Sequence, residues 1–163
     1  MDKENELFDA FIKSYLFSLK YLQDFISAPA AEYGISFDQF LILREVEEAK
    51  GEITLMDVAE AHRVSRSAIS RQISGLLDND YVFQQIDPHD RRRKILGLTE
   101  QGKKVEAKLL EISLKRAREW TKIFGVERLG QVLKFIEEFT QEVVTKEPGY
   151  FATRSEVKAD LDK

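Results

Sequence analysis

The stretch that decides the fold is His62-Arg63-Val64-Ser65-Arg66-Ser67-Ala68-Ile69-Ser70-Arg71-Gln72-Ile73-Ser74-Gly75-Leu76-Leu77, which reads as a turn followed by an amphipathic helix. Two short strands follow at once, Tyr81-Val82-Phe83-Gln84-Gln85-Ile86 and Lys94-Ile95-Leu96-Gly97-Leu98. Between them lies the charged segment Asp87-Pro88-His89-Asp90-Arg91-Arg92-Arg93. A helix with a small, polar outer face that precedes a basic hairpin is typical of a winged helix-turn-helix, a fold that binds DNA.

The predicted recognition helix has an inner and an outer face. Ser65 is the predicted N-cap, and the predicted inner positions are Ile69, Ile73, Leu76 and Leu77. Serine and arginine dominate the other face, and the candidate DNA-binding residues of this helix are Ser65, Arg66, Ser67, Ser70, Arg71 and Ser74. Arginine can read guanine through two hydrogen bonds, and serine lets the backbone approach the bases closely. An ordinary solvated helix face is the alternative, but such faces usually mix acids with bases, and this stretch contains no acid.

The tip of the hairpin is the second candidate site. Asp90, Arg91, Arg92 and Arg93 are its predicted DNA-binding residues, because an arginine on a wing can enter a narrow minor groove. Phosphate would repel Asp90, so we expect its carboxylate to pair with an arginine and hold the wing in shape. The alternative is a charged hairpin turn without a partner.

Helices are predicted on both sides of this region. Residues 6–27 form one long helix with an apolar seam, which Pro29 and Gly34 end, and a further seam marks a last helix. Between them, capping boxes open two helices, Ser36 with Gln39 and Thr54 with Asp57, and Ile53 forms a short strand. Thr99 caps a long helix that runs to about Phe124. The two seams consist of Phe8, Ile12, Tyr15, Leu19, Leu22 and Ile26, and of Leu129, Val132, Ile136, Phe139 and Val143.

Charge is distributed unevenly along the chain. The net charge is −4, yet residues 62–94 hold seven basic and four acidic residues, so this segment is positive and the rest carries −7. A basic island on an acidic body is expected of a local DNA-contacting face. The chain has no cysteine, which excludes disulfides, thiolate nucleophiles and thiol-based redox sensing. We expect a cytosolic protein, because no apolar run is long enough for a membrane span and the acidic start is not a signal peptide.

At this point the sequence resembles the MarR family of bacterial winged-helix regulators. The resemblance rests on Asp90-x-Arg92-x5-Leu98-Thr99, on Thr99-Glu100-Gln101-Gly102 and on the helix opening Val64-Ser65-Arg66-Ser67-Ala68-Ile69-Ser70-Arg71. The order of elements matches from about residue 6 to about residue 145. One departure is Asp80-Tyr81-Val82, which stands where the family usually has Gly-Leu-Ile or Gly-Leu-Val.

The resemblance implies a homodimer that binds a near-palindromic operator. Residues 1–34 and 100–147 would form the helical dimerisation region, residues 35–99 the winged helix-turn-helix domain, and residues 148–163 a charged tail. By similarity, Arg92 would enter the minor groove with Asp90 as its structural partner. The resemblance also implies a repressor that a phenolic or other lipophilic small molecule releases, and Tyr21, Tyr33, Phe37 and His62 are the candidate effector residues.

Other functions are disfavoured. No glycine-rich phosphate loop, nucleophile elbow or catalytic histidine pairing supports an enzyme, and we expect no cofactor. The two histidines, His62 and His89, show no convergent pattern of carboxylates, so no metal site is predicted. A winged helix that serves as a protein-interaction module without specific DNA binding is the alternative that stays open.

Overall fold

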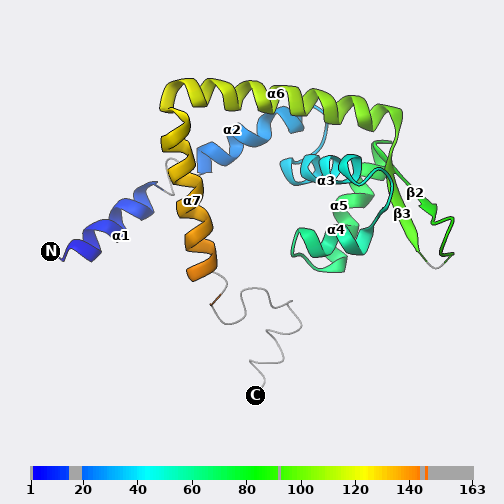
Figure 1. Ribbon diagram of the computed structural model, residues 1–163, viewed down its shortest axis with the longest axis horizontal. Coiled ribbons are helices and arrows are strands. Elements are labelled where there is room, and N and C mark those ends of the chain that lie inside the picture. Colours follow the sequence, from blue (N-terminus) through cyan, green and yellow to red (C-terminus); the bar gives the residue numbers. More distant parts are fainter. Residues whose placement is uncertain (1, 15–19, 92, 144–145, 147–163) are drawn as a thin grey trace, which may run out of the picture.

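The computed structural model describes residues 2–14, 20–91, 93–143 and 146. The elements in chain order are α1 (Lys3–Ser14), α2 (Lys20–Ala31), α3 (Phe37–Glu48), β1 (Ile53–Thr54), α4 (Leu55–Ala61), α5 (Arg66–Asp78), β2 (Val82–Ile86), β3 (Lys94–Leu98), α6 (Glu100–Phe124) and α7 (Val126–Glu142). In Figure 1, α3, α4, α5 and the β2–β3 hairpin gather under the N-terminal part of α6, whereas α7 turns away from its other end. The predicted fold class, mainly helical with a small β-hairpin wing, is confirmed.

The sheet joins the hairpin to the helices. Its strand order is β1-β3-β2, and both pairs are antiparallel. Ile53 of β1 pairs with Leu96, and Val82 of β2 pairs with Leu98, so the central strand β3 buries its side chains while β2 exposes most of its own. The hairpin is therefore anchored at its base and exposed along one edge.

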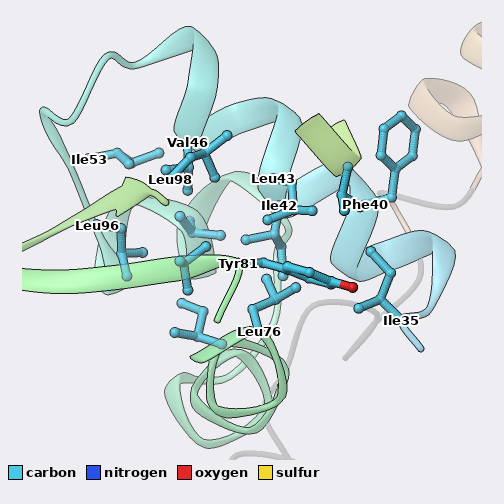
Figure 2. Close-up of a cluster of buried hydrophobic side chains, with 14 of the residues drawn as sticks. Ile35, Phe40, Ile42, Leu43, Val46, Ile53, Leu76, Tyr81, Leu96 and Leu98 are labelled. Carbon is cyan, nitrogen blue, oxygen red and sulfur yellow. The ribbon is translucent and has the colours of Figure 1, made fainter. Parts of the chain in front are cut away.

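The core lies between α3, α5, the sheet and the start of α6. Leu43, Val58, Ile69, Leu76 and Leu96 are almost completely buried in it. Figure 2 shows aliphatic side chains gathered around the ring of Tyr81. The Tyr81 hydroxyl donates a hydrogen bond to the backbone carbonyl of Tyr33 at 2.9 Å, which satisfies the one polar atom that this ring brings into the core.

Both predicted capping boxes are confirmed. The Ser36 hydroxyl accepts the backbone N–H of Gln39, whose side chain accepts the backbone N–H of Ser36. Thr54 and Asp57 form the same reciprocal pair at the start of α4. Each box satisfies two N–H groups that a helix start would otherwise leave without partners.

Asp80 follows the C-terminus of α5 with a φ of +56°. Its N–H donates to the carbonyl of Leu77, and the next N–H, of Tyr81, donates to the carbonyl of Leu76 at 2.9 Å. This is a Schellman ending, whose left-handed residue is usually glycine. Asp80 stands where the family that the sequence resembles usually has glycine, and the backbone explains that preference, because the position needs a positive φ.

The long helix predicted over residues 6–27 has different bounds. Two helices lie on either side of residues 15–19, which are outside the described residues together with Tyr15 and Leu19 of the predicted seam. The expectation that Pro29 ends the helix is wrong, because α2 continues through Pro29 to Ala31. Proline has no N–H, so the carbonyl of Phe25, one turn earlier, loses its helical donor.

Arg116 of α6 supplies the missing donor. Its Nη1 donates to the Phe25 carbonyl at 2.7 Å, and its guanidinium carbon lies 4.3 Å from the centre of the Phe25 ring. Trp120, one turn further along α6, packs against the same ring with centroids 6.3 Å apart. The charged side chain of Arg116 thus joins α6 to α2.

Helices α1 and α7 have no buried residue in this single chain. Leu7, Phe11, Leu133 and Phe135 are all more than half exposed. The seam predicted for the last helix lies on this exposed surface, where Val132 and Ile136 are also more than half exposed. Such amphipathic helices gain little stability alone, since most helical stability comes from packing an apolar face.

Within the described part of the chain, no helix is both long and apolar enough to cross a membrane. The predicted tail beyond residue 148 lies outside the described residues.

Candidate nucleic-acid interface

Helix α5 is held by a short buried stripe. Its N-cap is Ser65, whose hydroxyl accepts the backbone N–H of Ala68 at 3.2 Å, as predicted. Ile69, Ile73 and Leu76 are at most 1% exposed and anchor the inner face. The expectation that Leu77 faces inward is wrong, because its side chain is 38% exposed. At 100° per residue, Leu77 lies on the edge of the stripe rather than in its centre.

The opposite face of α5 is basic and exposed. Arg66, Ser67, Ser70, Arg71 and Ser74 are all exposed, and the first turn contains no acid. Ser65 differs from these residues: it is half-buried, and its hydroxyl contacts both the Ala68 N–H and the Ser67 hydroxyl, the latter at 3.0 Å. Ser65 therefore serves the helix end first. The remaining five side chains can all point at one groove or one stretch of phosphates.

The turn before α5 fixes its direction. His62 is the C-cap of α4, and Arg63 follows with a φ of +52°. The N–H of Arg63 donates to the carbonyl of Glu60, and the N–H of Val64 donates to the carbonyl of Ala59, each at 3.0 Å. These two bonds close a second Schellman ending, so α4 stops abruptly and α5 can start after Val64.

Gln39 ties α5 to the helix behind it. Its side-chain amide, which also completes the capping box of α3, donates to the backbone carbonyl of Gln72 at 2.9 Å. Helix α5 is thus held from its inner side by the apolar stripe and by a hydrogen bond from α3. A fixed helix can present its outer residues in one orientation.

The predicted DNA-binding residues of the wing lie in different surroundings. Arg91 is exposed at the tip, and Arg92 lies outside the described residues. Arg93 lies 3.5 Å from Asp87 and 4.0 Å from Asp57, measured between guanidinium nitrogens and carboxylate oxygens. The carbonyl of Asp90 accepts the backbone N–H of Arg93 at 2.9 Å. The predicted pairing of the Asp90 carboxylate with an arginine stays a prediction.

Asp87 is a wing residue that the sequence analysis did not single out. Its carboxylate accepts the backbone N–H of His89 at 2.8 Å, and the pKa of Asp87 is lowered, first by this bond and further by the Asp90 N–H and the Arg93 charge. The signal was present in the sequence, because an aspartate before Pro88 commonly bonds the backbone two residues on. His89 itself is exposed, and no group of three potential metal ligands occurs in the described part of the chain.

One of the four predicted effector residues lines a hollow in the described structure. A hollow of about 360 Å³ lies between α2 and the start of α3, lined by Leu22, Gln23, Ile26, Ser27, Ser36, Phe37 and Asp38. Of the four candidates, Phe37 lines it; Tyr21 is exposed and Tyr33 packs against the core. His62 bonds Glu45 through its Nε2 at 3.0 Å. Helical spacing alone does not show whether an aromatic side chain packs in the core or lines a pocket.

Known proteins match this chain in both sequence and fold. A family model described as the MarR family matches residues 33–93. The HTH-type transcriptional regulator SarZ of Staphylococcus aureus (strain USA300) is 26% identical over 84 residues, which are 52% of this chain and 56% of SarZ. The chain thus spans about half the length of this curated relative.

Solved structures match over a longer range. A MarR transcriptional regulator from Methanosarcina mazei Go1 is 27% identical with a TM-score of 0.63, over 83% of this chain and 98% of that one. The Staphylococcus aureus MepR–DNA complex is 19% identical with a TM-score of 0.67, over 80% of this chain and 95% of that one. The second likeness concerns the fold alone.

Proposed function

We propose that this chain is a winged-helix transcriptional regulator of the MarR family and that it binds double-stranded DNA. The observation that carries the proposal is the outer face of α5, where two arginines and three serines are exposed without an acid among them. The MepR fold relative, which was solved with DNA, supports the same assignment. Arg66 and Arg71 would contact bases or phosphates, and the wing would reach the adjacent groove.

Substitution of Arg71 tests this proposal. If Arg71 contacts DNA, Arg71→Ala should weaken binding by about 1–3 kcal/mol, on the order of 5- to 150-fold. The matched control is Arg118→Ala, which removes the same charge from an exposed position on α6. Equal affinities for both variants, measured by fluorescence anisotropy on DNA from upstream of the gene, would contradict the assigned interface and favour the protein-interaction module.

The predicted role of Arg92 is tested in the same assay. Arg92→Ala should cost on the order of 1–3 kcal/mol of DNA affinity if this side chain enters the minor groove. A folded variant with undiminished binding would contradict that role.

The protein acts as a homodimer in this proposal. Helices α1 and α7 each expose apolar side chains, among them Phe8 and Phe11 on α1 and Leu133 and Phe135 on α7, and a soluble monomer rarely presents so much exposed apolar surface. A second copy would cover it through the dimerisation region predicted from residues 1–34 and 100–147. Two copies of α5 would then enter major grooves about 10 bp apart, so the operator should be a near-palindrome. Leu133→Lys should shift the sedimentation coefficient towards the monomer, whereas Lys134→Ala on the same helix should leave it unchanged.

Repression and its release complete the proposal. A dimer on a promoter blocks polymerase access, and a lipophilic ligand would release it by binding between the dimer region and the winged helix. The hollow lined by Ile26, Phe37 and Asp38 supports this location, because it lies where α2 meets α3. Salicylate and phenol are suitable probes of the two expected ligand chemistries. Loss of the anisotropy signal on adding either probe supports the proposal, and full retention with both contradicts it for this ligand class.

A further inference from the structure

We propose that Arg93 is a positioning residue that fastens the tip end of the β2–β3 hairpin to α4, and that it is not one of the DNA-contacting arginines. The inference rests on the proposed DNA-binding function and changes the role predicted for one residue. Arg93 directly precedes β3, where the hairpin strands meet the connecting loop. There the N–H of Asp87 donates to the Arg93 carbonyl at 3.0 Å, so the two residues face each other across the strands.

The guanidinium of Arg93 lies between two acids from different elements. Its Nη1 is 3.5 Å from Oδ2 of Asp87, at the end of β2, and its Nη2 is 4.0 Å from Oδ2 of Asp57, in the first turn of α4. A planar fork with several donors can satisfy two carboxylates at once, which lysine cannot do in the same way. We call Asp57, Asp87 and Arg93 the wing latch.

Both acids of the wing latch are held by their own elements. The Asp87 side chain is only 11% exposed and accepts the His89 N–H, so it is fixed within the tip. The Asp57 carboxylate accepts the backbone N–H of Thr54 at 2.8 Å and the Thr54 hydroxyl at 2.7 Å. Arg93 therefore contacts two acids that are already oriented, and less side-chain freedom is lost than in an ordinary surface pair.

The charge balance argues against a phosphate contact. Two carboxylates already compensate the Arg93 guanidinium, and both would repel a phosphate brought close to it. Arg91 and Arg93 are both exposed, and Arg91 lies at the tip. Because α4 packs directly against α5, a wing fastened to α4 keeps a constant distance from the recognition helix. The wing latch thus sets how the two DNA-contacting elements are placed relative to each other.

The substitution Asp87→Asn separates the two roles by the sign of its effect. It removes a negative charge from the wing and leaves every arginine in place. If Arg93 contacts phosphate, the variant should bind DNA more tightly and with a steeper salt dependence, because a freed guanidinium neutralises one more phosphate. If Arg93 belongs to the wing latch, the variant should bind roughly two- to fivefold more weakly with an unchanged salt slope.

A control and a second readout keep the test independent of the proposed function. Asp78→Asn removes the same charge from an exposed position at the end of α5, outside the wing latch, and should not weaken binding. In the DNA-free protein, amide hydrogen exchange at Arg93 should become faster in Asp87→Asn and stay unchanged in Asp78→Asn. Tighter DNA binding by Asp87→Asn, or unchanged exchange at Arg93, would overturn the wing latch. Failure of the unaltered protein to bind DNA would instead count against the proposed function, and the exchange result would still decide the latch.

Discussion

Replacement of Gly102 by alanine should destabilise the protein through one backbone contact. A Cβ at this position would lie 1.9 Å from the carbonyl oxygen of Tyr81, whereas real Cβ atoms essentially never approach closer than 3.0 Å. The start of α6 would have to move by about 1 Å. That shift would strain two hydrogen bonds at the same junction, from the Thr99 N–H to the Tyr81 carbonyl at 3.1 Å and from the Thr99 hydroxyl to the Asp80 carbonyl at 2.6 Å.

The magnitude follows from three contributions. Overpacking costs about 1–3 kcal/mol, and each weakened hydrogen bond costs about 1 kcal/mol. The better helix propensity of alanine returns about 1 kcal/mol. Gly102→Ala should therefore lower the free energy of unfolding by about 3 kcal/mol, which is roughly 6–12 °C in Tm for a chain of this size.

Urea denaturation and thermal melts, followed by circular dichroism, measure this loss. Gln101→Ala, at an exposed position in the same turn of α6, is the control and should change the free energy of unfolding by no more than about 0.5 kcal/mol. If Gly102→Ala were as stable as this control, the close approach of α6 to Tyr81 would be refuted.

Substitutions at Asp80, Arg116 and Asp57 should also change the stability of the protein. Asp80→Gly should stabilise the protein by about 1 kcal/mol in urea denaturation, because glycine adopts the +56° φ without strain, and Asp80→Ala should not. Arg116→Met should cost about 1 kcal/mol, and less in a Pro29→Ala background, where the restored N–H can bond the Phe25 carbonyl; equal costs in both backgrounds would contradict this link. Hydrogen bonds from the Thr54 hydroxyl and then from the Thr54 N–H lower the pKa of Asp57 in the folded protein. The ionised Asp57 therefore stabilises the fold at pH values above 3.8, the ordinary pKa of this group, and the stabilisation is lost as the pH falls through the lower pKa of the folded state. Asp57→Asn should accordingly show a shallower fall of Tm with acidification.

Local sequence rules were sufficient to predict most helix starts and the exposed face of α5. The capping boxes at Ser36 and Thr54 and the N-caps at Ser65 and Thr99 were read correctly, because each depends on residues within one turn. The outer face of α5 followed from its periodicity in the same way. Leu77 was placed wrongly, since the edge of a buried stripe depends on what packs beside it.

Contacts between distant residues account for what local sequence rules did not predict. Pro29 lies inside a helix because Arg116, far along the chain, supplies the donor that proline lacks. The DNA contact predicted for Arg93 stays a prediction, but the sequence did not indicate its two acidic neighbours, Asp57 and Asp87, which come from different elements. Residue spacing along the sequence cannot predict the contacts of Arg116 with α2 or of Arg93 with Asp57, because they join elements that are far apart in the chain. They are consequences of how the hairpin packs against α4 and how α2 packs against α6.

DNA binding by the unaltered protein is the claim on which the account depends. We would measure it by fluorescence anisotropy with a duplex from upstream of the gene, against a scrambled duplex, over a series of salt concentrations. A dimer whose arginines neutralise several phosphates should bind tightly at low salt, prefer the upstream duplex and lose affinity steeply as salt rises. Absence of binding to either duplex at low salt would contradict the account and leave the winged helix as a protein-interaction module.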